Sequence, residues 1–495
     1  MRKDFLSGRP QEKVVVYSGD RYWLSALITI RINAPLTAAG YQIIQGNDSQ
    51  GLMVTDLTGV DFVIVHRDFP RQINQYFHVL REARKHEIPI IYEIDDLLFD
   101  LPADHPERRN GYYTQGLVAM LLAARKADLV TTTTEQLANF LCPFNPNIRI
   151  LPNYLDDSLW HMKPPKQAEP DQGKIVVGYI GGESHFPDLK MIVPALTALI
   201  EKYGSEIEFK FWGLQPPEEL TANSQVEGFP PVYDYQKFAN SFSSERIDLL
   251  IAPLLNNIFN NCKSNLKFLE YSALGVPAVY SRSVPYEGIV KHGINGFLAS
   301  STEEWYRCMQ ALIESPTLRD QMAINAQETV KKDWLLSLHA GDWADAYHSI
   351  TYIKQAVPEV VQEQESVLEK VLQEQMTRVN YLQENLNEQE KSAQVLKSQM
   401  EDLQAQEADR EQANQTLSVQ LAEKEQAVQA LSAQAAEREQ QMEALAGQLH
   451  EITASKAWGA ALLLRRMRVF LLPPGSLRLQ LARKILTPLL FHKSK

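Results

Sequence analysis

The hydrophobic pattern of this chain changes near residue 350, and that change limits the possible folds more than any other feature. Before it, short apolar runs alternate with segments whose apolar residues recur every three or four positions. Such alternation is typical of parallel strands covered by helices. After about residue 360, apolar residues recur in heptads within sequence rich in Gln, Glu and Ala. Because 495 residues are too many for one core, we expect two compact domains and then an extended segment.

The first half predicts an α/β, Rossmann-like domain over residues 1–160. Its expected strands are residues 14–17, 41–44, 62–65, 88–92, 129–132 and 148–151. A helix through Ile28, Leu36 and Ala39 is expected between the first two strands. Residues 161–172 are polar and rich in proline, as linkers are. A second alternation predicts another Rossmann-like domain over 173–330, with strands at 175–180, 209–212, 247–251 and 278–280.

The heptads predict a long coiled coil over residues 358–452. One register places apolar pairs such as Leu368/Leu372 and Leu445/Leu449 on the seam, with polar pairs such as Arg410/Asn414 between them. No proline interrupts this register, so a coiled coil of roughly 85 residues, about 130 Å long, is expected within this range. Polar layers weaken a coiled coil but fix its register, which favours a homodimer. The alternatives are a solvated single helix and a disordered polar tract.

The C-terminal end of the chain is basic, whereas the rest is acidic. After Glu451 there are nine Lys and Arg residues and no acidic residue, so the net charge of −12 divides into +9 there and −21 over residues 1–451. An acidic body argues against nucleic acid as a partner. Residues 453–495 combine their basic charge with Leu, Trp458 and Phe470, which predicts an amphipathic tail on an anionic membrane surface. The alternative is a small helical cap packed on the coiled coil.

Cysteine usage and hydropathy predict a cytoplasmic location. Cys142, Cys262 and Cys308 form no C-x-x-C pair, so neither a disulfide framework nor structural zinc is expected. The N-terminus lacks the apolar core of a signal peptide, and no apolar window of about 20 residues could span a bilayer. We expect the basic tail to be the part that holds the protein at the inner face of the plasma membrane.

The segment from Lys263 to Gly296 predicts a nucleotide-sugar site. A polar loop leads into a helix with apolar residues at helical spacing, Gly275 ends this helix, and a short apolar strand follows. The unpaired N–H groups at the start of such a helix favour a diphosphate. About one turn further along, Glu270 could accept hydrogen bonds from a ribose diol. The alternative is that Glu270 is a solvated helix residue and that an ordinary turn follows it.

At these residues the chain resembles the retaining GT-B glycosyltransferases of family four, also called glycosyltransferase group 1. The resemblance covers residues 12–350 and implies two Rossmann-like domains facing a cleft, with residues 331–352 crossing back onto the first domain. The family's E-x₇-E pair maps its ribose-binding carboxylate onto Glu270 and its other carboxylate onto Cys262. The family's Arg and Lys phosphate clamp falls on Gly182 and Pro187. This sequence therefore departs from the family pattern at both places.

The resemblance implies a donor site in the second domain. Lys263 and His185 are the catalytic candidates here, and Lys263 would stabilise the charge on the departing diphosphate. Either His185 or Lys190 would substitute for the missing clamp. The donor-binding candidates are Glu270, Ser264, Asn265, Lys267, Gly181, Gly182, Lys190 and Glu287. Gly181 and Gly182 would allow close approach of a ligand to the backbone, and Asp188 suits the N-cap of a helix.

The first domain offers candidates for the acceptor side. Asp95 and Asp96 follow a strand and resemble an E-x-D-D loop, where they would take a catalytic role in positioning acceptor hydroxyls, or else cap the next helix. Weaker acceptor-side candidates are Gly19, Arg21, Arg31 and His66. The sequence Glu93-Ile-Asp95 imitates the metal-binding D-x-D of another glycosyltransferase fold. The two-domain pattern argues against that fold, so we expect neither a metal nor a cofactor.

These observations favour a glycosyltransferase that moves a hexose-like sugar from a nucleoside-diphosphate sugar to a glycan or lipid-linked acceptor. The resemblance implies retention of configuration and a place in bacterial surface polysaccharide or glycoconjugate synthesis. One alternative is a GT-B sugar-nucleotide epimerase. Another is a coiled-coil scaffold with a degenerate sugar-nucleotide-binding module, because Cys262 and the missing clamp depart from the family pattern.

Overall fold

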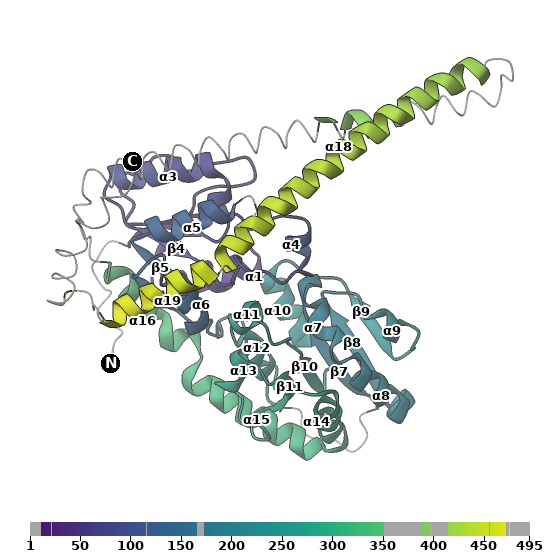
Figure 1. Cartoon of the computed structure of the whole chain (residues 1–495). Helices are drawn as coiled ribbons and strands as arrows, with labels where there is room; N and C mark the ends of the chain where they lie inside the picture. Colours follow the sequence, from purple (N-terminus) through teal and green to yellow (C-terminus); the bar gives the residue numbers. More distant parts are fainter. Residues whose placement is uncertain are drawn as a thin grey trace. The chain divides into compact units, whose positions relative to one another are not determined.

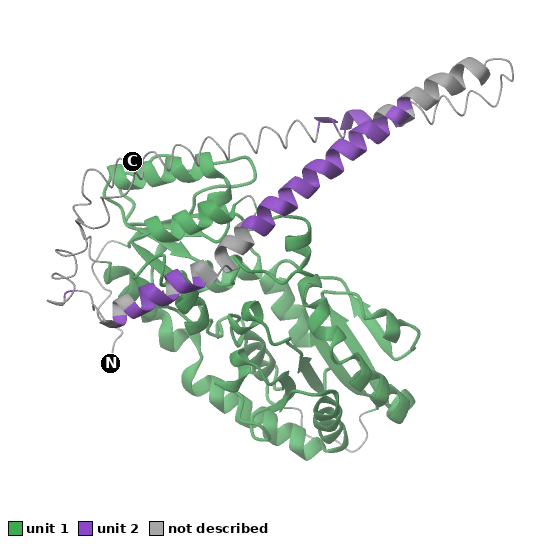
Figure 2. Cartoon of the chain, in the orientation of Figure 1, with its two compact units in different colours: residues 1–379 green, residues 380–495 purple. Residues whose placement is uncertain are grey.

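The chain folds into two units, residues 1–379 and residues 380–495 (Figure 2). The computed structural model describes residues 11–20, 22–114, 116–165, 173–350, 388–389, 391–394, 396–397, 414–454, 456–471 and 475. The first unit contains two six-stranded parallel sheets, so the predicted α/β class with two Rossmann-like domains is confirmed (Figure 1). Each sheet is buried on both faces by helices, as parallel sheets require.

The N-terminal sheet has the strand order β2-β1-β3-β4-β5-β6. Its strands are β1 (Lys13–Ser18), β2 (Gln42–Gln45), β3 (Phe62–His66), β4 (Ile90–Glu93), β5 (Leu129–Thr132) and β6 (Ile148–Ile150). Its helical segments are α1 (Ala26–Ile28), the π-helical η1 (Thr29–Asn33), α2 (Ala34–Ala38), η2 (Phe69–Arg71), α3 (Ile73–Lys85), α4 (Pro106–Arg109), α5 (Leu117–Lys126) and α6 (Glu135–Leu141). All six predicted strands are present here. The predicted helix between β1 and β2 is interrupted by the π-helical turn.

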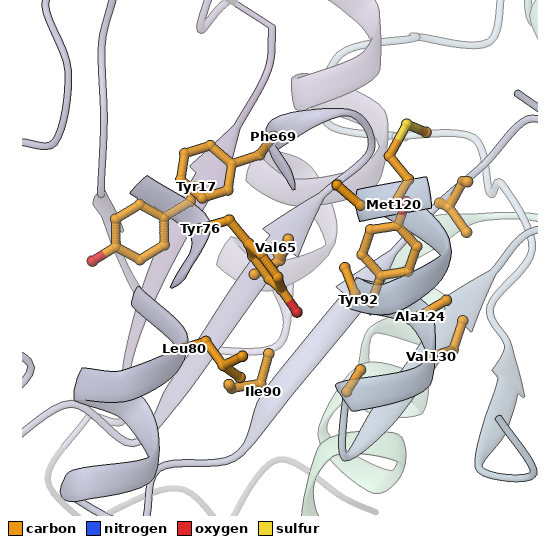
Figure 3. Close-up of a cluster of buried hydrophobic side chains, with 14 of the residues drawn as sticks. Tyr17, Val65, Phe69, Tyr76, Leu80, Ile90, Tyr92, Met120, Ala124 and Val130 are labelled. Atoms are coloured by element: carbon orange, nitrogen blue, oxygen red, sulfur yellow. The ribbon is translucent and has the colours of Figure 1, made fainter. Parts of the chain in front are cut away.

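One face of this sheet packs against α3 and α5. Figure 3 shows the cluster, in which Tyr17, Val65 and Tyr92 meet side chains such as Tyr76 and Met120. Alternate residues of each strand point to this face, because side chains of a strand alternate between the two faces. The tyrosine hydroxyls are satisfied by the backbone: that of Tyr17 donates to the Val54 carbonyl and that of Tyr92 to the Arg67 carbonyl. This core therefore also fixes the backbone at the carboxyl end of β3.

The opposite face is covered partly by a helix from the end of the unit. Trp343 and Tyr347 of α16 (Leu336–His348) are buried against strand residues such as Val16 and Ile64. The backbone also joins here, since Leu155 N donates to Trp334 O and Leu336 N donates to Leu155 O. The chain thus returns from the second domain to complete the core of the first.

The C-terminal sheet has the strand order β12-β11-β10-β7-β8-β9. Its strands are β7 (Ile175–Ile180), β8 (Ile207–Trp212), β9 (Val226–Phe229), β10 (Leu249–Ala252), β11 (Ala278–Ser281) and β12 (Phe297–Ala299). Its helical segments are η3 (Glu183–His185), α7 (Phe186–Lys190), α8 (Val193–Tyr203), η4 (Gly204–Glu206), α9 (Glu218–Thr221), α10 (Tyr235–Ser244), α11 (Ile258–Asn261), α12 (Leu266–Ala273), α13 (Val284–Glu287), α14 (Thr302–Glu314) and α15 (Pro316–Asp333).

Helices α8 and α14 cover one face of this sheet, and α10 and α12 cover the other (Figure 1). The edge strands β9 and β12 were not predicted from the sequence. Each is short, and β9 has an exposed glutamate and a glycine at its centre. Gly275 ends α12 with φ +67°, as predicted, and a side chain there would strike the Lys163 carbonyl.

In the second unit, the described part of the predicted coiled coil is helical: it comprises short stretches at 388–389, 391–394 and 396–397 and the long helix α18 (Asn414–Ala454), which α19 (Lys456–Leu471) follows. Most of residues 358–413, and residues 476–495 of the tail, lie outside the described residues, as do residues 166–172 of the linker. None of the described helices combines the length and apolar character needed to cross a membrane.

Candidate active site

The predicted diphosphate loop lies against the N-terminal domain. Three consecutive residues make this contact: Cys262 O accepts from Thr134 Oγ1 at 2.8 Å, Lys263 Nζ lies 3.5 Å from Asp96, and Ser264 Oγ accepts from Asn153 at 2.8 Å. The segment therefore joins the donor-side and acceptor-side candidates in one place.

Cys262, which takes the place of the family's first carboxylate, is buried in the core of the N-terminal domain. Burial raises the pKa of its thiol to about 11, so the side chain is neutral. It cannot supply the charge that a carboxylate would bring to a sugar.

Glu270, the predicted ribose ligand, lies on the buried side of α12. Its Oε1 accepts a hydrogen bond of 2.6 Å from Tyr235 Oη, which in turn accepts from Trp160 Nε1 at 3.1 Å. Burial raises the pKa of Glu270 to about 7, against the opposing effects of the Tyr235 hydrogen bond and the Lys267 charge. Glu270 is only 6% exposed. The alternative interpretation, in which Glu270 is a solvated residue on the helix surface, is therefore wrong.

Two lysines border the start of α12. Lys267 Nζ lies 5.2 Å from the centre of the Tyr179 ring, and burial lowers its pKa to about 8. Lys263 Nζ lies over the Phe259 ring at 4.4 Å while it faces Asp96. Lys263 therefore lies between an aromatic face and a carboxylate, and Lys267 is a cation held in a low-dielectric environment that favours an anionic ligand.

His185 forms a dyad with Asp188. Its Nδ1 lies 2.8 Å from Asp188 Oδ2, while Asp188 Oδ1 accepts from Leu255 N and from Asn260 Nδ2. Burial, followed by the positive charge of Lys267, lowers the pKa of His185 to about 4, so the ring is neutral. Because ionised Asp188 only accepts, Nδ1 carries the hydrogen and Nε2 is an acceptor. Asp188 was expected as an N-cap, but it lies inside α7 and orients His185 instead.

On the acceptor side, Arg67 lies between the two predicted aspartates, Asp95 and Asp96, and pairs with both. It forms an ion pair with Asp95, and its Nη1 lies 3.6 Å from Asp96 Oδ2. Burial acts to raise the pKa of Asp96, but the charges of Lys263 and Arg67 outweigh it and hold this pKa below its usual value. Arg67 has φ +50°, a conformation that costs energy for a residue with a side chain and that recurs at functional sites.

Arg31 and His66 lie beneath this surface. Arg31 is 1% exposed and donates to Glu93, to Leu151 O and to Asn153 Oδ1. Because Asn153 also donates to Ser264, a continuous polar chain runs from the carboxyl end of β4 to the diphosphate loop. His66 is fully buried, and its Nδ1 lies 2.9 Å from Ser18 Oγ. Direct contact of these two side chains with an acceptor stays a prediction, and the structure gives them a supporting position.

The remaining candidates occupy varied positions. A side chain at Gly181 would overlap the Tyr179 hydroxyl, and one at Gly19 would overlap Asp68, whereas Gly182 faces open space. Lys190 is exposed, 3.9 Å from Glu219, so the structure does not bring it to the His185 dyad. Of the other donor-side candidates, Asn265 is the N-cap residue of α12 and Glu287 is exposed at the end of α13. The acceptor-side candidate Arg21 lies outside the described residues.

Within the described part of the chain, no three His, Cys, Asp or Glu side chains are grouped so that they could hold a metal ion. The aspartates of the site are instead paired with Arg67 and Lys263.

Sequence reasoning missed Arg67, Asn153 and Asn260. Arg67 directly follows β3, and Asn153 comes soon after β6, so both lie at carboxyl ends of parallel strands, where ligand sites of such sheets occur. Their position after a strand could have identified Arg67 and Asn153 as candidates. No sequence pattern identifies Asn260, because its hydrogen bond to Asp188 depends on the packing of α11 against α7.

Comparison with known proteins gives one family match. Residues 192–345 match the family described as "Glycosyl transferase-like", and the match includes Lys263, Lys267 and Glu270. No curated protein sequence matches the chain.

Among solved structures, Anabaena HepE in complex with UDP-glucose is 13% identical, with a TM-score of 0.48 over 68% of this chain and 99% of its own. WaaG, a glycosyltransferase involved in lipopolysaccharide biosynthesis, is 14% identical, with a TM-score of 0.47 over 68% of this chain and 100% of its own. A glycosyltransferase from Rickettsia africae is 13% identical, with a TM-score of 0.48 over 70% of this chain and 100% of its own.

The family match includes the segment from Lys263 to Gly296 on which the resemblance was based, and it does not reach the His185 loop. Residues 192–345 are therefore similar to a glycosyl transferase-like family.

Proposed function

We propose that this protein is a GT-B glycosyltransferase that transfers a hexose-like sugar from a nucleoside-diphosphate sugar to a glycan or lipid-linked acceptor. The single observation that carries this proposal is the meeting of Lys263 with Asp96. It places the diphosphate loop of the glycosyl transferase-like domain beside the acidic loop of the other domain. A donor held by the first and an acceptor held by the second would have their reacting atoms in one cleft.

The proposed chemistry begins with loss of the nucleoside diphosphate from the anomeric carbon. Lys263 and Lys267 stabilise the negative charge that develops on the leaving phosphate, and the free N–H groups at the start of α12 add to this effect. Ionised Glu270 accepts hydrogen bonds from the ribose hydroxyls. Neutral His185 accepts a hydrogen bond at Nε2 from a sugar hydroxyl, with Asp188 fixing its orientation.

Asp96 has two parts in this proposal. Without donor it neutralises Lys263, and when the diphosphate arrives it is displaced from that lysine and remains held by Arg67. The freed carboxylate then positions the acceptor hydroxyl. Retention of configuration, metal independence and a place in bacterial surface polysaccharide synthesis belong to the same proposal and rest on the family resemblance.

A degenerate sugar-nucleotide-binding scaffold is the second candidate, and one observation favours it. Cys262 carries a buried, neutral thiol at the position where the family has a carboxylate. In this second proposal the protein binds a donor without turning it over, while its helical second unit assembles partners.

Measuring product formation by the full-length chain separates the candidates. A glycosyltransferase releases nucleoside diphosphate from a bound nucleotide sugar far faster when glycan or lipid-linked acceptors are added. A scaffold binds the nucleotide sugar but releases nothing with any acceptor of the panel. An epimerase yields a second sugar nucleotide without acceptor. The anomeric signal of the product in proton NMR reports retention or inversion.

The second unit belongs to this proposal as an assembly and localisation device. A homodimer through the heptad helix and contact of the basic tail with the inner face of the plasma membrane would present the cleft to a lipid-linked acceptor. Four apolar side chains of α19 are exposed, namely Leu463, Leu464, Met467 and Phe470, the last at 85%, which supports a role at an interface.

A further inference from the structure

Helix α18 carries an apolar stripe that nothing in its own unit covers among the described residues. Val428, Leu431, Met442 and Leu445 are 47%, 53%, 53% and 68% exposed. Their spacing of three, eleven and three residues places all four at the a and d positions of the predicted heptads. Among the described side chains of this 41-residue helix, the large exposed apolar ones all lie on this seam, which indicates a partner helix.

Two basic residues interrupt this seam. Counting heptads from Leu431 as position d places Lys424 and Arg438 at d as well. Glu439 follows Arg438 at position e. In a two-stranded parallel coiled coil a d side chain packs into a hole that includes the partner's e residue. Arg438 of one chain can therefore pair with the partner's Glu439, and the reverse pair forms by symmetry.

We propose that α18 forms a parallel, in-register coiled-coil dimer with a second copy of this chain, held by reciprocal Arg438–Glu439 pairs. This inference does not depend on the catalytic proposal. It states the orientation and register of the pair as well as its existence.

Orientation follows from where the basic residues fall. In the parallel pair, Lys424 meets Lys424 and Arg438 meets Arg438, so basic residues are confined to two layers that have acidic e neighbours. In the antiparallel pair that aligns the same stretch, Lys424 lies opposite Met442 and Arg438 opposite Val428. That arrangement spreads the charges over four layers, each with a basic group against an apolar one, which is costly. A parallel pair also brings both basic C-terminal segments to the same end.

Cysteine cross-linking of the full-length chain tests the orientation. Leu445 lies far from the middle of the stretch, so Leu445→Cys places two thiols face to face only in the parallel register. The exposed native Cys142 is first replaced by serine. Mild oxidation should link more than half of the Leu445→Cys chains. The matched control Gln440→Cys, at position f on the outer side, should stay unlinked.

Two further measurements test the dimer and its ion pairs: the mass in solution, and the effect of exchanging the charges of Arg438 and Glu439. Light scattering should give twice the chain mass of 56.2 kDa. Arg438→Glu should raise the dimer dissociation constant at least tenfold, and adding Glu439→Arg should restore most of the loss. A mass of one chain, as a helix folded back on its own chain would give, overturns the proposal. A dimer in which Leu445→Cys links only to Leu421→Cys overturns the parallel register.

Discussion

Glu270 and Lys267 are two site residues whose charges change close to neutral pH. Their pKa values are about 7 and about 8, both displaced chiefly by burial. Donor binding through this site needs an ionised carboxylate for the ribose and a protonated amine for the diphosphate. As pH rises through 7 Glu270 becomes ionised and binding tightens; as pH rises through 8 Lys267 loses its proton and binding weakens.

We therefore expect nucleotide-sugar affinity to be greatest between pH 7 and 8 and about sixfold weaker at both pH 6 and pH 9. Calorimetry with an intact nucleotide sugar measures this, because its diphosphate does not titrate in that range. Glu270→Gln should remove the loss of affinity below pH 7, which is the acid limb of the profile. Lys267→Arg should remove the loss of affinity above pH 8. An acid limb that survives in Glu270→Gln would mean that another group binds the ribose.

Asp96 is expected to oppose donor binding, because it is paired with Lys263 of the predicted diphosphate loop. Asp96→Asn frees Lys263 for the diphosphate, so affinity for the nucleoside diphosphate should rise about fivefold, the equivalent of an ion pair of about 1 kcal/mol. Transfer to acceptor should nevertheless slow, because the carboxylate that positions the hydroxyl is lost. The control Asp100→Asn alters an exposed carboxylate near Arg108 and should change neither quantity. Weaker binding of the nucleoside diphosphate by Asp96→Asn would contradict the proposal that the diphosphate displaces Asp96 from Lys263.

At the scale of elements, helix α16 shows how one segment of the chain stabilises a domain far away in sequence. Trp343 is 1% exposed and packs in the core of the N-terminal sheet, with its ring centre 5.9 Å from the Arg31 guanidinium. Loss of this side chain would remove core contacts and the face on which Arg31 rests, and Arg31 begins the polar chain to Ser264.

Trp343→Ala should lower the free energy of unfolding by about 3–5 kcal/mol in urea denaturation. Leu338→Ala lies on the same helix but alters a residue that is 57% exposed, so it should cost less than about 0.5 kcal/mol. Equal losses in the two variants would mean that helix propensity, and not packing on the sheet, sets the contribution of α16.

Sequence alone predicted the elements well where burial is continuous. The central strands, such as Val63–Val65 in β3 and Leu249–Ile251 in β10, are apolar runs buried on both faces, so their pattern is strong. The edge strands β9 and β12 lack that signal. The candidate site was found where it follows strand ends or a helix start, as with Asp95, Asp96 and Glu270. Asn260 and Tyr235 could not be found, because they reach the site through contacts between elements distant in sequence.

At the scale of the whole molecule, the chain is acidic as far as Glu451 and basic after it. The last described helix, α19, exposes Leu463, Leu464, Met467 and Phe470, which lie within one arc of the helix. By helical spacing, Arg466 lies near one border of that arc and Arg465 on the opposite side of the helix. An apolar face with arginines at its border and on the polar side is typical of a helix that lies in the headgroup region of an anionic membrane.

Full-length protein should therefore float with vesicles containing phosphatidylglycerol and not with phosphatidylcholine alone. Replacing Arg465 and Arg466 by glutamine should weaken that binding about 30-fold, from about 1 kcal/mol per charge. Phe470→Asp should weaken it further by removing apolar contact. Equal flotation with both lipids would contradict the electrostatic part of this account.

The most direct measurement of the central claim is a thermal-unfolding screen of the full-length chain against nucleoside-diphosphate sugars, with and without EDTA. We expect one donor to raise the melting temperature, at a concentration of about 100 times Kd by the equivalent of about 2.7 kcal/mol, and EDTA to leave the shift unchanged. At pH 8 the shift should be smaller in Glu270→Gln and in Lys263→Ala than in the wild type. If no donor stabilises the wild-type chain, or if the two variants respond as the wild type does, the site around α12 does not bind a nucleotide sugar.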